Sequence, residues 1–195
     1  MSIASNYELI YLERVKLALG NHPRVQLAGE GTPSAVLVPI FEKEGSLHLL
    51  LTRRTQKVHR HKGEISFPGG VKEEEDVSLL DTVLREVKEE LGLVACDIHM
   101  LGIVDDTKTW RSNFVITPYV GWIPYPYPFA INCAEIAEVL EIPLSFFLDE
   151  KNGWEANIYI KDKVVYTPFY YWQSKTIWGA TARIVKNFCQ LLDGI

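Results

Sequence analysis

The sequence predicts a single domain of the α+β class, with an α/β/α arrangement of layers as the closest alternative. The chain has 195 residues, which suits one domain with a well-buried core. Segments with the apolar patterns of β-strands occur among segments with helical periodicity. Because their order shows no regular βαβ alternation, the pattern favours mixed α and β structure over a fully parallel sheet.

The first third of the chain predicts a helix, a linker and a hairpin. Residues 6–19 place apolar residues among charges, which indicates an N-terminal helix, and residues 22–33 contain the glycine and proline of a linker. Residues 35–42 and 47–53 are apolar runs around a short turn and predict a β-hairpin. Residues 55–62 form a basic loop, and residues 64–67 are a candidate short strand. We therefore place the helix and linker at residues 1–34 and the main domain at residues 35–195, within one compact unit overall.

The most regular predicted element is a helix at residues 80–91. Asp76 or Ser78 can cap its start, and Gly92 can end it in a left-handed conformation. Strands are predicted at residues 97–104 and 114–122, whereas the prolines at residues 125–128 exclude that segment from a central strand. Residues 143–148 predict a short helix, residues 154–160 and 163–171 a second hairpin, and residues 176–192 a C-terminal helix.

Composition excludes several classes of protein. The formal net charge is −5, which argues against a protein that binds nucleic acid through a basic surface. We find neither a signal-peptide pattern at the N-terminus nor an apolar stretch of the roughly 20 residues that span a bilayer. Cys96, Cys133 and Cys189 have no C-x-x-C spacing, so we expect three free thiols in a reducing cytoplasm. A metal site in this protein should therefore use oxygen ligands.

The helix at residues 80–91 separates an apolar face from an acidic one. On a helical wheel, four apolar residues lie within roughly 60° on either side of Leu80: Val83, Leu84, Val87 and Leu91. Glu86, Glu89 and Glu90 gather on another arc, with Glu86 and Glu90 one turn apart. Like charges at this spacing repel, and a bound divalent cation would relieve the repulsion. Mg²⁺ prefers such carboxylates together with waters and phosphate oxygens.

The segment before this helix supports a metal site over a merely solvated acidic face. Phe67, Pro68, Gly69 and Gly70 form a loop whose glycines allow close approach of backbone or phosphate. The loop upstream is rich in cations and histidines: Arg53, Arg54, Lys57, His59, Arg60, His61 and Lys62. A basic loop, a glycine turn and a carboxylate helix in succession suit the binding of a polyphosphate against metal ions.

These residues resemble a known motif. Gly70 and residues 85–93 resemble the Nudix box, whose pattern is G-x5-E-x7-R-E-U-x-E-E-x-G-U with U aliphatic. The second half fits at every fixed position, but the interval from Gly70 to Arg85 is one residue longer than the pattern, so the isolated Glu position falls near Glu75 or Asp76. Residues 50–55 and 61–70 look like the coenzyme A pyrophosphatase branch, as do residues 112–118, 135–144 and 177–183. In that branch Ser or Ala is usual at the position of Thr55 and Arg at the position of His59.

The resemblance implies a Nudix fold, with a mixed β-sheet sandwiched between α-helices. It implies Mg²⁺- or Mn²⁺-dependent hydrolysis of the pyrophosphate bond of coenzyme A or its derivatives, giving 4′-phosphopantetheine and adenosine 3′,5′-bisphosphate. By matching position, Glu86 and Glu90 would be the principal metal ligands and Glu89 a further ligand or the base. Arg85 would orient a carboxylate, because a guanidinium can bind it through two nitrogens.

Several assignments stay open at this level. The general base could be Glu89, Glu64 or Glu138. Candidates for phosphate contacts are Arg54, Arg60 and Lys62, with Gly69 and Gly70. Trp110 and Tyr119 either stack on adenine or belong to the core. The partner is expected to be a small nucleotide, with a monomer or a homodimer equally compatible. The alternative functions are hydrolysis of a dinucleotide, ADP-ribose or a nucleotide sugar, and a non-catalytic nucleotide-binding module.

Overall fold

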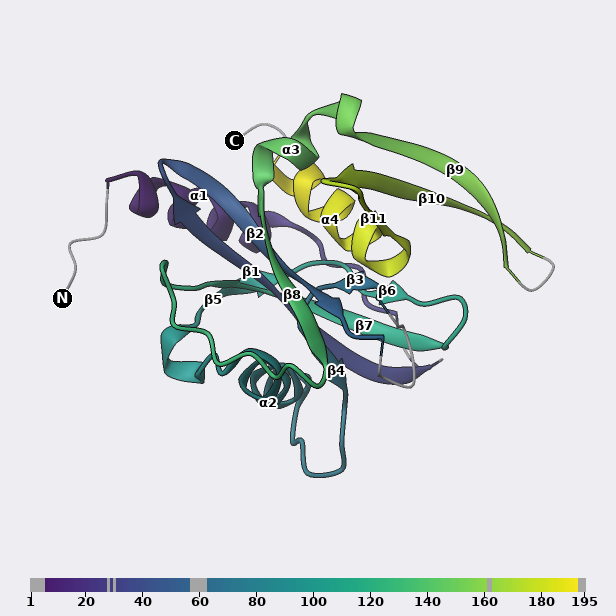
Figure 1. Ribbon diagram of the computed structural model, residues 1–195, viewed down its shortest axis with the longest axis horizontal. Helices are drawn as coiled ribbons and strands as arrows, with labels where there is room; N and C mark the ends of the chain where they lie inside the picture. The colour runs from purple at the N-terminus through teal and green to yellow at the C-terminus, as the bar shows by residue number, and fades with distance from the viewer. Residues whose placement is uncertain (1–5, 28, 30, 57–62, 161–162, 193–195) are drawn as a thin grey trace.

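The computed structural model describes residues 6–27, 29, 31–56, 63–160 and 163–192. The described residues form two β-sheets and four α-helices (Figure 1). The helices are α1 (Asn6–Asn21), α2 (Leu79–Leu91), α3 (Leu144–Leu148) and α4 (Gly179–Leu192). Two short 3-10 helices lie at Ala95–Asp97 and Glu150–Asn152.

The larger sheet is mixed and is built around β1. Its eight strands are β1 (Thr32–Lys43), β2 (Ser46–Arg54), β3 (Ile65–Ser66), β4 (Gly69–Val71), β5 (His99–Ile103), β6 (Thr107–Lys108), β7 (Phe114–Trp122) and β8 (Ile136–Pro143). The strand β1 pairs antiparallel with β2 and β4 and parallel with β7. The strand β6 pairs with β7, and β8 pairs with β2. The predicted first hairpin is therefore confirmed, as are strands near residues 97–104 and at 114–122.

The second sheet is antiparallel and has three strands: β9 (Gly153–Ile160), β10 (Lys163–Trp172) and β11 (Lys175–Trp178). The hairpin of β9 and β10 was predicted. The prediction of a helix from residue 176 was wrong at its start, because Thr176 and Ile177 pair with β10 and the helix begins only at Gly179. Thr176 and Ile177 are β-branched and Ile177 is fully buried, so packing in the sheet outweighs the helical pattern that follows.

Helices cover both faces of the larger sheet (Figure 1). On one face, α2 packs Val83, Val87 and Leu91 against Leu37 and Phe41. The other face packs against α1, α3, α4 and the second sheet, in a core that includes Val15 and Leu19 of α1. This arrangement confirms a mixed sheet between helices. The boundary between residues 34 and 35 stays a prediction.

Other expectations concern cysteines and membranes. The three cysteines are free, with Cys96 and Cys133 exposed and Cys189 buried. Among the described helices, none combines the length and the apolar composition needed to cross a membrane.

Candidate active site

The ends of α2 are fixed by local contacts, and this sets the directions of its acidic side chains. Ser78 is the N-cap: its hydroxyl accepts from the backbone N–H of Asp81 at 3.2 Å, and the Asp81 carboxylate accepts from the Ser78 N–H at 2.8 Å. At the other end, Gly92 adopts φ 67°, and its N–H donates to the Lys88 carbonyl. Of the two predicted caps, Ser78 is therefore the one that operates.

Asp76 instead binds Arg85. The Arg85 Nε and Nη2 atoms donate to the two oxygens of Asp76 at 3.1 and 3.0 Å. Thr82 donates its hydroxyl proton to the same carboxylate at 2.9 Å. Hydrogen bonding from Arg85, with help from the Glu73 backbone N–H, holds the pKa of Asp76 well below its usual range. Asp76 is thus an ionised anchor that fixes the position of Arg85.

From this anchor, Arg85 reaches the carboxylates of α2. Its Nη1 donates to Glu86 at 2.9 Å and to Glu89 at 3.4 Å, and its Nη2 also donates to the Val71 carbonyl at 3.1 Å. Glu86 is mostly buried, whereas the Glu89 side chain is 58% exposed. The geometry suits the expected role of Arg85 in orienting a carboxylate.

Glu90 is the most deeply placed acid of the group, with 2% of its surface exposed. Arg54 donates to one of its oxygens at 3.1 Å and the Gly69 N–H donates to the other at 3.2 Å. Burial raises the pKa of Glu90 to about 7, partly opposed by Arg54 and by the Gly69 N–H. Burial likewise raises the pKa of Glu86. Both acids therefore lie where a bound cation would favour their ionised forms.

The two glycines before α2 are needed for different reasons. A Cβ atom on Gly70 would collide with the Glu86 carboxylate, so this glycine leaves the space that the acid occupies. Gly69 adopts φ 145°, and a Cβ there would collide with the Ala35 carbonyl and with Val36. The missing side chain at Gly69 therefore allows β4 to lie close to the backbone of β1, and the missing side chain at Gly70 makes room for the Glu86 carboxylate.

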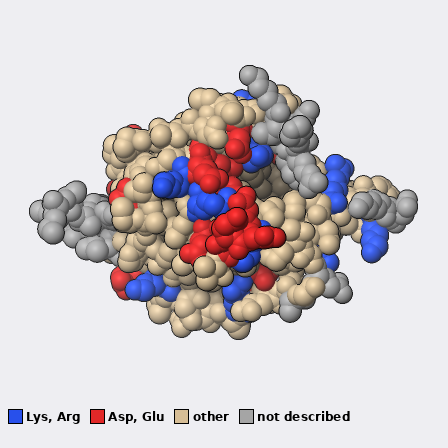
Figure 2. Space-filling view, turned by 90° about the horizontal axis from the view of Figure 1, so that it is seen from below, with Lys and Arg blue, Asp and Glu red and all other residues tan. Residues whose placement is uncertain are grey.

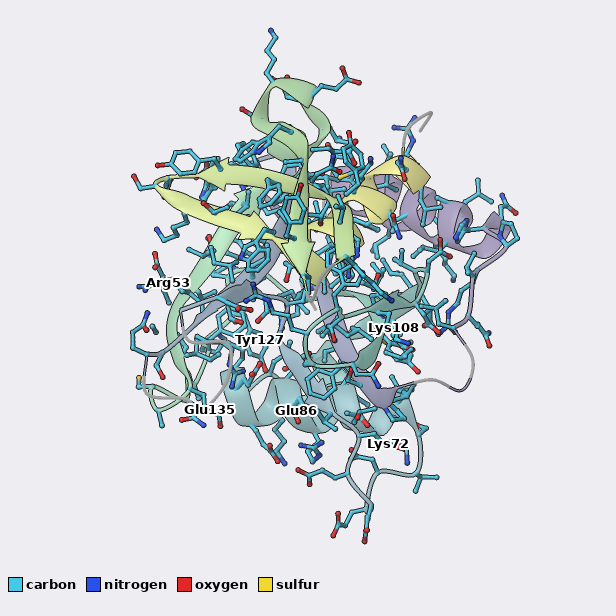
Figure 3. All side chains as sticks on the ribbon, turned by 90° about the vertical axis from the view of Figure 1, so that its right-hand side faces the viewer. Arg53, Lys72, Glu86, Lys108, Tyr127 and Glu135 are labelled. Carbon is cyan, nitrogen blue, oxygen red and sulfur yellow. The ribbon has the colours of Figure 1, made fainter. Side chains whose placement is uncertain are left out.

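The structure adds one acid that the sequence did not single out. Glu135, just before β8, lies 3.5 Å from Arg54 Nη2 and is 42% exposed on its side chain. In Figure 3, Glu135 and Glu86 lie at the level of α2, below Arg53. The charge of Glu135 contributes to the raised pKa of both Glu86 and Glu90. Nothing in the local sequence indicates this proximity, because β8 reaches the site only through its pairing with β2.

Glu138, the third candidate for the base, lies apart from the acids of α2. Glu138 lies opposite Arg53 in the sheet and accepts from its Nε at 2.9 Å. It also pairs with Lys175 of the second sheet at 3.3 Å. Glu138 therefore faces the second sheet and not α2, and its two cations hold its pKa below the ordinary value despite partial burial. The choice among Glu64, Glu89 and Glu138 stays a prediction.

Other predicted residues divide into three groups. Arg54, Gly69 and Gly70 contact the carboxylates of α2. Tyr119 packs on the core beneath α2 and so belongs to the core, whereas Trp110 lines the cavity described next. The predicted contacts of Arg60 and Lys62 fall outside the described residues, as do Lys57, His59 and His61.

A cavity of about 590 Å³ lies beside the acidic cluster, on the side of the larger sheet that faces α4. Its walls come from β1, β4, the β6–β7 turn, the second sheet and the first turn of α4. Glu64, Arg54, Gly69 and Gly70 line it, but the carboxylates of α2 do not. Arg54 and Gly69 line the cavity and also donate hydrogen bonds to Glu90, so the cavity adjoins the acids of α2 at these two residues. The volume suits a nucleotide-sized ligand.

The donor set fits a divalent cation, although no such site is preformed. Among the described residues, no three Asp, Glu, His or Cys side chains converge closely enough to hold a metal. Instead, Glu90 forms an ion pair with Arg54, and Glu86 and Glu89 form ion pairs with Arg85. Figure 2, which views the molecule from below Figure 1, shows acidic and basic side chains side by side in the middle of that face. The carboxylate oxygens of Glu86, Glu89 and Glu90 are of the ligand type that Mg²⁺ or Mn²⁺ prefers, and the missing side chain at Gly70 lets Glu86 lie against the backbone of β4.

Comparisons with known proteins give matches both in sequence and in fold. Residues 31–135 match the family model described as "NUDIX domain". The chain is 32% identical over 180 residues to a protein named uncharacterized Nudix hydrolase NudL from Photorhabdus laumondii, covering 92% of this chain and 95% of that protein. A protein of the same name from Yersinia pestis is 36% identical over 159 residues, covering 80% and 78%. A crystal structure of a MutT/nudix family protein from Enterococcus faecalis shares the fold, with TM-score 0.55, 19% identity and coverage of 99% of this chain and 76% of that one.

Proposed function

Because the chain belongs to the Nudix hydrolase family, we propose that it hydrolyses the pyrophosphate bond of coenzyme A or one of its derivatives, using Mg²⁺ or Mn²⁺. The observation that carries this proposal is the junction between the cavity and the acids. Arg54 and Gly69 line the cavity and bind Glu90. A substrate in the cavity would therefore place its phosphates beside the carboxylates of α2.

The proposed metal ligands are Glu86, Glu89 and Glu90. A bound divalent ion supplies charge neutralisation at the pyrophosphate and lowers the pKa of a water. Arg85, anchored on Asp76, keeps Glu86 and Glu89 oriented. Because Asp76 holds Arg85 through two hydrogen bonds, Arg85 keeps its place if Glu86 and Glu89 turn away from it.

Arg54 and the glycine backbone have the proposed role of phosphate binding. Arg54 is a cation on the cavity wall, and its two carboxylate partners keep its guanidinium at the edge of the acidic cluster. Gly69 and Gly70 expose backbone on the same wall without side chains that would keep a phosphate away.

Two residues are proposed as alternatives for the general base. Glu89 is the more exposed acid of α2 and has only one long contact to Arg85. Glu64 lines the cavity itself. Replacing each in turn with Gln separates them, since loss of the base lowers kcat and removes the limb of the pH–rate profile that it controls.

Support for coenzyme A as the substrate comes from residues 50–55 and 61–70, which resemble the coenzyme A pyrophosphatase branch, and from the cavity volume of about 590 Å³. A cavity of this size can hold more than a pyrophosphate group. The nucleoside half of such a substrate would occupy it.

The test is a panel of substrates assayed with Mg²⁺ and with Mn²⁺: coenzyme A, NADH, ADP-ribose and nucleoside triphosphates. We expect the highest kcat/KM for coenzyme A, with products that identify cleavage of the pyrophosphate bond. Glu86→Gln should lower turnover by orders of magnitude, whereas Glu13→Gln, an exposed acid on α1, should leave it unchanged. Equal turnover of all substrates would reject coenzyme A, and background turnover in both wild type and Glu86→Gln would reject catalysis.

A further inference from the structure

Two arginines on the cavity wall lack the carboxylate partners that four other arginines have. Four arginines each contact at least one carboxylate: Arg24, Arg53, Arg54 and Arg85. Within the part of the chain that the structure describes, Arg111 and Arg183 have no carboxylate within salt-bridge distance, yet both line the cavity. Among the described residues, no carboxylate therefore neutralises their positive charges.

Each of these arginines is held by a tryptophan that also lines the cavity. The Arg183 Cζ atom lies 3.7 Å from the centre of the Trp110 ring, and the Arg111 Cζ atom lies 5.9 Å from that of Trp178. Arg183 Nη2 also donates to the Lys108 carbonyl at 2.7 Å. A guanidinium held against an aromatic face is oriented but keeps its charge.

Arg183 has unused capacity for binding an anion. Its Nη1 atom is buried and has no hydrogen-bond partner among the described residues. Burial lowers the pKa of Arg183 to about 10, so the group stays charged at neutral pH. A half-buried cation without a counter-ion is costly, and groups perturbed by burial occur often at functional sites, so Arg183 is a candidate for binding an anionic ligand.

The position of this pair places it away from the acidic cluster. In this part of the larger sheet the strands follow the order β4, β1, β7, β6. The glycines lie on β4, and Trp110 and Arg111 follow β6. Three strand spacings, roughly 14 Å, separate the backbone of β4 from that of β6. A group bound by Arg111 and Arg183 is therefore distinct from a pyrophosphate beside Gly70, and a nucleoside could connect them.

We propose that Arg111 and Arg183 form a second anion subsite, which binds a phosphate monoester on the nucleoside half of the substrate. This inference rests on the proposed function, because it takes the cavity to be the substrate site. The two guanidinium groups supply the charge and the hydrogen-bond donors, while Trp110 and Trp178 hold them in place. The subsite would select substrates that carry a phosphate in addition to the scissile pyrophosphate.

The test compares two ligands that differ only by that phosphate: adenosine 3′,5′-bisphosphate and adenosine 5′-monophosphate. Calorimetry in EDTA measures both affinities without metal or turnover. We expect the wild type to bind the bisphosphate about 10- to 100-fold more tightly. Arg183→Gln should remove most of this preference with little effect on the monophosphate. Arg14→Gln, an exposed arginine of α1, should retain the preference in full.

A second variant keeps the test valid if Arg183→Gln does not fold. Arg111 is exposed, so Arg111→Gln tests the same subsite where Arg183→Gln proves unstable. Equal affinity of the wild type for both ligands, or full preference in both glutamine variants, overturns the subsite. The substrate panel tests catalysis separately. If the protein prefers the bisphosphate but hydrolyses no substrate of the panel, the subsite stands and the proposed function is rejected. If it hydrolyses coenzyme A but binds both ligands equally, only the subsite is rejected.

Discussion

Glu90→Gln should make the metal-free protein more stable at about pH 8, although it removes a proposed metal ligand. The pKa of Glu90 rises from its ordinary value of 4.5 to about 7 because the carboxyl is buried. A raised pKa means that the folded protein binds the proton more tightly than the unfolded chain. The free energy of unfolding therefore falls as the pH rises through this interval and stays low above it.

The size of the effect follows from the same shift. Each pKa unit corresponds to about 1.4 kcal/mol, so ionised Glu90 costs the metal-free fold up to about 3 kcal/mol. Glutamine recovers only part of this, because Arg54 and the Gly69 N–H donate to different oxygens of Glu90, and one of these becomes an NH2 group that cannot accept. In this variant Arg54 can still pair with Glu135, so the positive charge of Arg54 keeps a carboxylate partner. We expect a gain of about 1–2 kcal/mol, or roughly 2–8 °C in Tm.

Mg²⁺ should reverse the order of stability, so that the wild type melts at a higher temperature than Glu90→Gln. Mg²⁺ at a hundredfold excess over its Kd adds about 2.7 kcal/mol to a protein with an intact site. Thermal melts in EDTA and in Mg²⁺, for wild type, Glu90→Gln and the exposed control Glu13→Gln, measure both effects. If Glu90→Gln melts below the wild type in EDTA at about pH 8, the ion pair with Arg54 outweighs the burial of charge and the reasoning fails. If Mg²⁺ stabilises both proteins equally, Glu90 is not a ligand.

Two further predictions concern the groups around these acids. Gly70→Ala should displace Glu86 and so lower kcat/KM about tenfold or more, while leaving Tm nearly unchanged. Gly69→Ala should lower the free energy of unfolding by about 1–3 kcal/mol, because its Cβ meets the backbone of β1. Kinetics and thermal melts of both variants test this, and a loss of stability in Gly70→Ala with a loss of activity alone in Gly69→Ala would contradict the geometry. Arg85→Lys should lower kcat about 10- to 100-fold, because lysine cannot bind Asp76 through two nitrogens and also reach Glu86; steady-state kinetics showing wild-type kcat would exclude the positioning role.

The acidic helix could be predicted because its signals are local. The cap Ser78, the apolar period and Gly92 all lie within one short segment. Even the burial of Glu90 follows from that period, since seven residues of a helix turn through 700° and place Glu90 about 20° from Val83 on the wheel. The acid next to the buried stripe is therefore the one that the fold encloses.

The surroundings of the helix depend on long-range register and could not be predicted. Whether Glu138 faces α2 or the second sheet depends on how β8 pairs with β2, and a shift of one residue reverses the face. The pairing contains a register shift between Arg53 and Arg54. The same pairing brings Glu135 to Arg54. Nothing within a single segment encodes these contacts.

Register also explains why two consecutive arginines have different partners. Successive residues of a strand point to opposite faces, so Arg53 binds Glu138 toward the second sheet while Arg54 binds Glu90 toward α2. This register begins at a two-residue turn, where Glu44 and Gly45 adopt φ 53° and 78° between the paired residues of β1 and β2. Such a turn fixes the alignment of its strands. A slip of one residue would exchange the two arginines, bury Glu90 without its counter-ion and separate the acidic cluster from the cavity. The position of the proposed catalytic groups therefore depends on a hairpin turn that contacts none of them.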